Sequence, residues 1–142
     1  WRQLGELCGK YLSKGRKVLD EHSRHEVDAI SGSCMMIPKH VFVQVGGFDE
    51  RYFMYAEDLD LCYAIMQAGY KIVYQPKAQM LHLKGQSGLH TYNRKVSDAF
   101  YDSMKLFYQK NFQDQYGKFT RWLVYAGIGF KKMLAHRTHK GH

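Results

Sequence analysis

The spacing of apolar and polar residues changes several times in the first third of the chain, which indicates several short elements. Small and apolar residues run through 27–37 without a helical period, which predicts a buried strand broken at Gly32. Pro38 suits the first turn of a short helix, and the pair Gly46 and Gly47 suits its end.

Further along, the same patterns predict a longer helix, two short strands and two final helices. Apolar residues recur at helical spacing over 57–68, and Gly69 marks the end of that helix. We interpret the segment 1–26 as a connection with little structure. The remaining elements are predicted from the spacing of apolar residues and turn residues alone. The strands are expected at 71–76 and 78–83 and the helices at 96–112 and 117–135.

Three carboxylates stand at the start of the helix expected over 57–68. On a wheel of about 100° per residue, Asp58 lies in the middle of the apolar stripe and Asp60 on the opposite side. We therefore expect Asp60 to be an exposed acid favoured by the helix dipole. Asp58 needs a partner or an open cleft, because a carboxylate facing a core is costly unless it is satisfied.

Two interpretations of this acidic pair stay open from spacing alone. Asp58 or Glu57 could cap the helix, since both stand where backbone N–H groups lack partners. Alternatively, Asp58 could accept a proton from a bound hydroxyl at a pocket beside the helix end.

Composition narrows the class of protein. The chain has 142 residues, a size typical of one domain or part of one. Its net charge of +8 is unevenly spread, with +3 over 1–25, −5 over 26–70 and +10 over 71–142. The acidic centre suits a site that handles a cation. Nucleic-acid binding is disfavoured because the basic residues follow no binding motif.

Other features suggest a compartment and a fragment. Three cysteines without a C-x-x-C pair favour a reducing, cytoplasmic location. The chain begins at Trp1 without a leader pattern, so we expect a piece of a longer protein.

The stretch "SGSCMMIPKHVFVQVGGFDERYFMYAEDLDLCYAIMQAGYKIVYQPKAQMLHLKGQSG" resembles family 2 glycosyltransferases, especially the bacterial rhamnosyltransferase-like members. The resemblance rests on a small-residue strand, a helix ending in "GGFDE", an "ED" pair opening the next helix, "AGY" closing it, and a strand ending in histidine. It implies an α/β fold of the GT-A type, a Rossmann-like sandwich, of which 27–95 would be the acceptor-side half and 96–142 C-terminal helices with a basic tail.

The resemblance also implies an activity and roles for residues. The expected reaction is sugar transfer from a nucleotide-diphosphate sugar to a hydroxyl of a saccharide or lipid-linked acceptor, with inversion, in bacterial polysaccharide or glycoconjugate synthesis. Asp58 would be the base and Glu57 its helper, Gly32 and Ser33 would line the floor of the site, and His82 would ligate a divalent metal, Mn or Mg. Among the aromatics before the pair, Phe53 and Tyr55 are candidates for sugar stacking, with core packing as the alternative.

The chain departs from the family in lacking the nucleotide-binding half that should precede residue 27. We therefore expect it to be inactive alone and to self-associate through unpaired strand edges. The alternative function is a non-catalytic carbohydrate-binding or interaction module. The segment 118–134 mixes Trp and Tyr with Lys and Arg, which favours contact with the inner face of a membrane, unless it packs on the domain or on a second copy.

Overall fold

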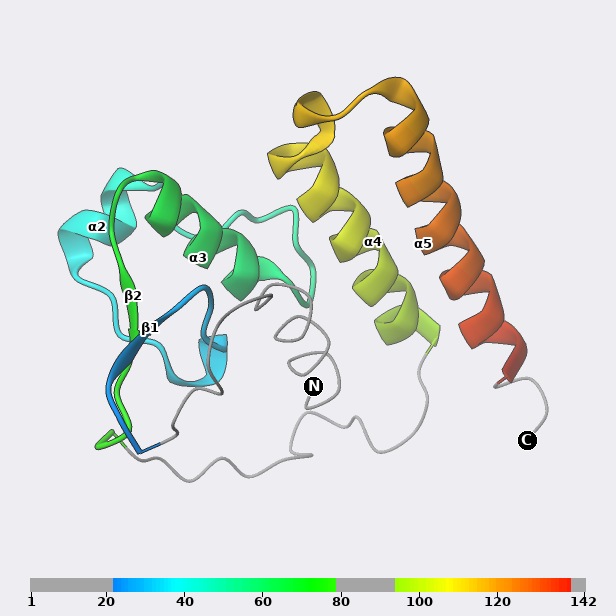
Figure 1. The fold of residues 1–142 in the computed structure, drawn as a ribbon. Coiled ribbons are helices and arrows are strands. Elements are labelled where there is room, and N and C mark those ends of the chain that lie inside the picture. The colour runs from blue at the N-terminus through cyan, green and yellow to red at the C-terminus, as the bar shows by residue number, and fades with distance from the viewer. Residues whose placement is uncertain (1–21, 79–93, 139–142) are drawn as a thin grey trace.

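The computed structural model describes residues 22–78 and 94–138, which form a mixed α/β arrangement (Figure 1). These residues form two short strands, two 3₁₀ turns and four helices. They are β1 (His25–Val27), η1 (Gly32–Cys34), α2 (Lys39–Gln44), α3 (Glu57–Gln67), β2 (Ile72–Tyr74), α4 (Arg94–Asn111), η2 (Gln113–Gln115) and α5 (Lys118–Thr138).

The first part of the fold packs α2 and α3 beside a two-stranded sheet. β1 and β2 pair antiparallel, with Glu26 opposite Val73. A small apolar core joins α2, α3 and β2, and Leu61 at its centre is 1% exposed. The buried members of this core are Val41, Leu61, Cys62, Ile65 and Ile72.

The strand predicted over 27–37 is wrong beyond its first residue. β1 ends at Val27, and the chain then turns through η1 instead of continuing as a strand. Serine chemistry explains the difference, because the Ser31 hydroxyl accepts the Ser33 N–H at 3.4 Å and the Ser31 carbonyl accepts the Cys34 N–H at 3.2 Å. Such local bonds offer the backbone an alternative to a sheet ladder.

The predicted helices are confirmed within one to three residues at each end, and so is the strand that contains β2. Gly47, with φ of 70°, closes α2 by donating to the Phe42 carbonyl, and a Cβ there would lie 3.0 Å from the Phe42 ring. Gly69 follows α3 with φ of 86°. Most of the strand predicted at 78–83, and most of the connection at 1–26, lie outside the described residues. The division of the chain at residues 95 and 96 stays a prediction.

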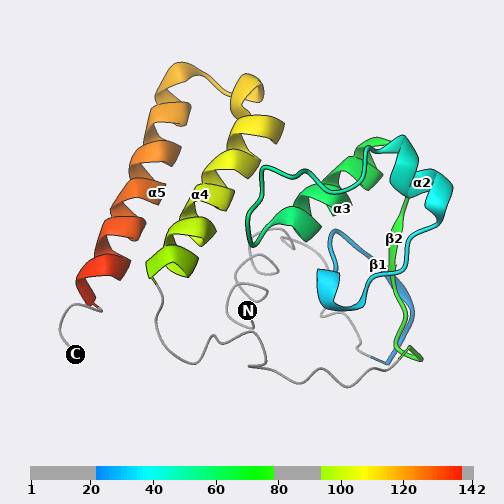
Figure 2. The same cartoon turned by 180° about the vertical axis from the view of Figure 1, so that it is seen from behind.

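Helix α4 lies between α3 and α5 in both views (Figures 1 and 2). One face, which carries Phe100, Ser103, Phe107 and Lys110, contacts α3 and the loop before it. The opposite face turns to α5. This two-sided packing follows from helical spacing, since those four positions recur every three or four residues.

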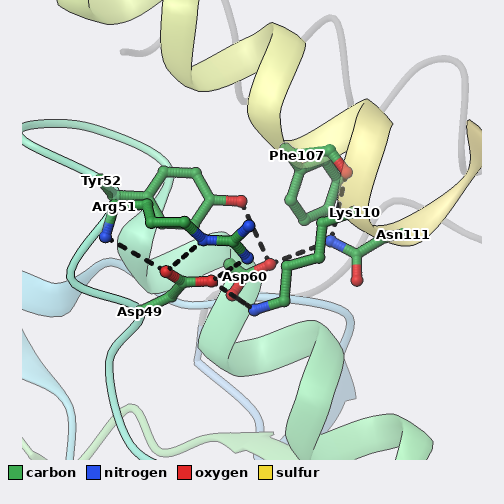
Figure 3. A network of polar contacts seen from close by, with 7 residues as sticks. All are labelled: Asp49, Arg51, Tyr52, Asp60, Phe107, Lys110 and Asn111. Carbon is green, nitrogen blue, oxygen red and sulfur yellow. Dashed lines mark hydrogen bonds and ion pairs between the residues drawn. The ribbon is translucent and has the colours of Figure 1, made fainter.

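A buried polar network joins α4 to α3 (Figure 3). Lys110 donates to Asp60 Oδ2 at 2.6 Å and to Asp49 Oδ2 at 2.8 Å. Tyr52 and Asn111 donate to Asp60 Oδ1 at 3.2 and 2.9 Å. Both oxygens of the Asp60 carboxylate therefore accept hydrogen bonds, as a buried carboxylate requires.

Charges in this network hold one another ionised. Hydrogen bonds from Arg51 and then Lys110 keep the pKa of Asp49 well below its usual value. Although burial opposes its charge, hydrogen bonds to Asp49 and Asp60 raise the pKa of Lys110. Burial, reinforced by the Asp60 charge, raises the pKa of Tyr52, so its hydroxyl remains a donor.

The expectation that Asp60 is exposed is wrong, since only 4% of the residue is accessible. The wheel placed it correctly on the side of α3 opposite Asp58. That side of α3 is covered by α4, whose Lys110 lies 50 residues further along the chain than Asp60. A helical wheel of α3 alone cannot predict which other helix packs against it.

Replacing Lys110 by Met should destabilise the fold by roughly 1–3 kcal/mol, because it leaves Asp60 buried without its cation while the lysine itself is partly exposed. Urea unfolding followed by circular dichroism measures the change. Lys77→Met, at an exposed lysine, is the matched control. Equal effects of the two substitutions would contradict a central role for Lys110.

Stability should also depend on pH through Asp49. Because its pKa is lower in the folded chain than the usual value near 4, its contribution is complete above about pH 4 and is lost as the pH falls through the folded pKa. Asp49→Asn should flatten the acid-side loss of unfolding free energy. Asp114→Asn, at an exposed carboxylate, should leave the pH profile as it is in the unmodified chain.

Candidate active site

The loop before α3 enters the helix through two strained residues. Tyr55 and Ala56 have φ of 69° and 64°, in the left-handed region that costs a residue with a side chain about 1–2 kcal/mol. The Ser103 hydroxyl donates to the Met54 carbonyl at 2.8 Å and fixes this loop to α4. Two consecutive strained residues, held by a buried serine, direct the start of α3 and therefore the acidic pair.

Asp58 lies on the first turn of α3 and is 8% exposed, in agreement with its predicted place in the apolar stripe. Its Oδ1 accepts the Leu59 N–H at 2.8 Å and its Oδ2 accepts the Gly32 N–H at 2.9 Å. Among the described residues, no Lys, Arg or His side chain forms an ion pair with it. Each oxygen of the Asp58 carboxylate is therefore satisfied by one backbone N–H group and by no side-chain cation of the described residues.

The structure thus supports part of the capping interpretation, since one oxygen of Asp58 satisfies an N–H of the first turn. It also shows a second bond, to η1, that capping alone would not need. Asp58 and Asp60 match a D-x-D sequence pattern, but they do not form one binding site. Their side chains bond to different elements on opposite sides of α3.

Gly32 and Ser33 lie in the exposed turn η1, so the structure brings Gly32 to Asp58 as the sequence grouped them. A Cβ on Gly32 would meet Asp58 Cβ at 3.4 Å and Oδ2 at 3.8 Å, an ordinary contact. The glycine therefore leaves open the space beside the carboxylate without being required by packing. The Ser33 hydroxyl lies 3.1 Å from that of Ser31.

Glu57 is partly buried beside Asp58. Its Oε2 atom is inaccessible and has no hydrogen-bond partner within 22–78 and 94–138. A buried carboxylate oxygen without a partner is an unused acceptor, which suits a group that positions a donor.

The two candidate stacking residues have different surroundings. Tyr55 packs edge-on against Phe100 with ring centroids 5.7 Å apart, so it is partly a packing residue. Phe53 is 82% exposed, which contradicts the core-packing alternative for that residue. An exposed ring four residues before Glu57 is available to a ligand.

The expected metal site is not supported by the residues described. Across 22–78 and 94–138, no three His, Cys, Asp or Glu side chains are grouped so that they could hold a metal ion. His82, the expected ligand, lies outside these residues.

The sequence analysis missed Ser103 and Lys110, which hold the loop and the helix that carry the site. A signal was present, since a serine and a lysine stand at helical spacing from Phe100 and Phe107 on one face of α4. Such a face is hard to identify in advance, because polar residues within it resemble exposed positions.

Comparison with known proteins bears on this geometry. The model of the family described as "Glycosyltransferase like family 2" matches residues 1–111, which include η1, α3 and α4. An N-acetylglucosaminyl-diphospho-decaprenol L-rhamnosyltransferase of Mycobacterium tuberculosis is 51% identical over 67 residues, 47% of this chain and 22% of that protein. Rhamnosyltransferase WbbL of Escherichia coli K12 is 45% identical over 56 residues, 39% of this chain and 21% of that protein.

A third relative, the low-salt glycan biosynthesis hexosyltransferase Agl10 of Haloferax volcanii, is 49% identical over 43 residues, 30% of this chain and 14% of that protein. The aligned segments thus span about a fifth or less of these relatives. No solved structure matches the chain significantly. The resemblance to rhamnosyltransferase-like enzymes is confirmed, and because the family model covers most of its length, the chain belongs to the glycosyltransferase-like family 2.

Proposed function

We propose that this chain is the acceptor-side part of an inverting glycosyltransferase whose complete catalytic domain has the GT-A fold. The observation that carries the proposal is the Asp58 carboxylate, which is buried at the start of α3 and held by two backbone N–H groups, one of them from Gly32 in the exposed turn η1. A base for an incoming hydroxyl needs such a place, charged but not neutralised by a cation.

In the proposed step, Asp58 accepts the proton of the acceptor hydroxyl as its oxygen forms a bond to the anomeric carbon of the donor. The bond from that carbon to the diphosphate breaks, and the nucleoside diphosphate leaves with the electron pair. A single displacement of this kind inverts the anomeric centre. Glu57, beside Asp58, would help to orient the acceptor, Gly32 and Ser33 would line the floor of the site, and Phe53 would offer a stacking face.

The names of the relatives support the choice of substrates to test. Two of them are named as rhamnosyltransferases and one as a hexosyltransferase, so a nucleotide-activated rhamnose is the first donor to test. The name of the mycobacterial relative, which contains a diphospho-decaprenol, makes a lipid-linked saccharide the first acceptor. The nucleotide-binding half would come from residues beyond this chain, which alone would then be inactive.

The alternative is a non-catalytic carbohydrate-binding module. The exposed ring of Phe53 favours it, because an aromatic face binds sugars without any chemistry. The two functions differ in one measurement on the complete protein: a binding module retains acceptor affinity but transfers no sugar from any nucleotide donor.

Asp58→Asn in the complete enzyme should lower kcat by at least about 100-fold, because the amide cannot take the proton. The melting temperature should also fall moderately, because the amide nitrogen cannot accept one of the two backbone N–H groups that Asp58 binds, but the protein should still fold. The matched variant is Asp60→Asn, which should lower the melting temperature through the Lys110 network and leave kcat nearly unchanged while the protein is folded. Equal losses of kcat in the two variants would overturn the assignment of the base.

Gly32→Ala tests the space beside Asp58. Because the added methyl group makes only ordinary contacts, the protein should fold normally, yet the methyl would occupy the position proposed for the sugar. We expect kcat/KM to fall at least about tenfold, a loss of about 1.4 kcal/mol in transition-state stabilisation. Gly117→Ala, where a Cβ meets open space, is the control, and a fully active Gly32→Ala enzyme would exclude this subsite.

A further inference from the structure

Helix α5 carries a row of exposed apolar side chains along one face. Trp122 is 63% and Phe119 73% exposed, and their rings stack with centroids 6.4 Å apart. At about 100° per residue, the row falls within an arc of roughly 120°. Its large members, all exposed, are Phe119, Trp122, Leu123, Phe130, Met133 and Leu134.

The opposite face of α5 is already used by α4. Lys132 donates to Asp102 at 2.9 Å and pairs with Asp98 at 3.2 Å, and His136 lies 2.9 Å from the same Asp98. Tyr125 packs edge-on against Tyr108. Because α4 covers the polar side of α5 and α5 is the outermost helix in both views, the apolar row faces away from the described part of the fold (Figures 1 and 2).

The charged residues of α5 indicate which kind of partner the apolar row contacts. α5 contains five Lys or Arg residues and no Asp or Glu. Lys118, Lys131 and Arg137 are exposed and stand beside the row or at its end. A second copy of α5 would bring these like charges together, whereas anionic lipid headgroups would neutralise them while the acyl region receives the apolar side chains.

The family match ends at residue 111, so α5 lies beyond the part of the chain that the family shares. No helix within the described ranges has both the length and the apolar character needed to cross a bilayer. A helix with aromatic residues on one side and cations at its borders lies in the plane of the interface instead.

We infer that the outer face of α5 docks on an anionic membrane surface, with the row from Phe119 to Leu134 inserted among the lipids. This contact is independent of which sugar is transferred and of the role of Asp58.

The test is co-sedimentation of the complete protein with vesicles of phosphatidylcholine, with and without phosphatidylglycerol. Binding should require the anionic lipid and weaken with salt. Trp122→Ser combined with Phe130→Ser should lower the partition coefficient at least about tenfold. Met36→Ser with Val43→Ser, at apolar positions outside α5 that are even more exposed, should leave the partition coefficient unchanged. Lys131→Gln should lower it about fivefold.

Fluorescence gives a second readout that does not depend on a destabilising variant. The chain has two tryptophans, so in a Trp1→Phe background emission from this chain reports Trp122 alone. Its emission should shift to the blue with anionic vesicles. Unchanged emission, or equal binding by the α5 and control variants, would overturn the proposal. A dimer in sedimentation without lipid that the α5 variant loses would overturn it too, assigning the row to a second copy.

Discussion

Ion pairs between Lys110 and two carboxylates link α4 to the first half of the described fold. Lys110 stands at the end of α4 and reaches two carboxylates from the first half of the chain, Asp49 after α2 and Asp60 on α3. Without it, Asp60 would face a helix with only neutral donors, and α4 would lose its charged link to α3. Helix α4 also fixes the loop before Glu57 through a separate bond from Ser103, so the packing of α4 as a whole supports the candidate site.

Two aspartates two residues apart on one helix illustrate how burial can serve different ends. Asp60 is surrounded by side-chain donors, a cation included, and its lone pairs are largely occupied. Asp58 bonds only to backbone N–H groups in the described structure and lies beside Gly32, the residue of η1 without a side chain. The first arrangement makes the carboxylate a structural link between two helices, whereas the second leaves the carboxylate without a cation partner in the described residues, which suits a proton acceptor.

Much of the local structure was predictable because it is encoded locally. Gly46, Gly47 and Gly69 ended helices where expected, since few other residues adopt positive φ without strain. The inward direction of Asp58 followed from the period of its own helix. The turn at Ser31–Cys34 was missed because side-chain bonds to the backbone compete with strand formation. The burial of Asp60 was missed because it depends on residues 50 positions away, whose arrival in space no local pattern indicates.

The tandem left-handed residues Tyr55 and Ala56 have a consequence for the direction of α3. A costly backbone conformation persists only where its surroundings impose it, and here Ala56 is buried and Tyr55 packs on Phe100. The two residues turn the chain sharply between the exposed ring of Phe53 and Glu57. Part of the packing energy of α4 is therefore stored as backbone strain that aligns the first turn of α3, so that the orientation of the acidic pair is set by a helix from the other half of the chain.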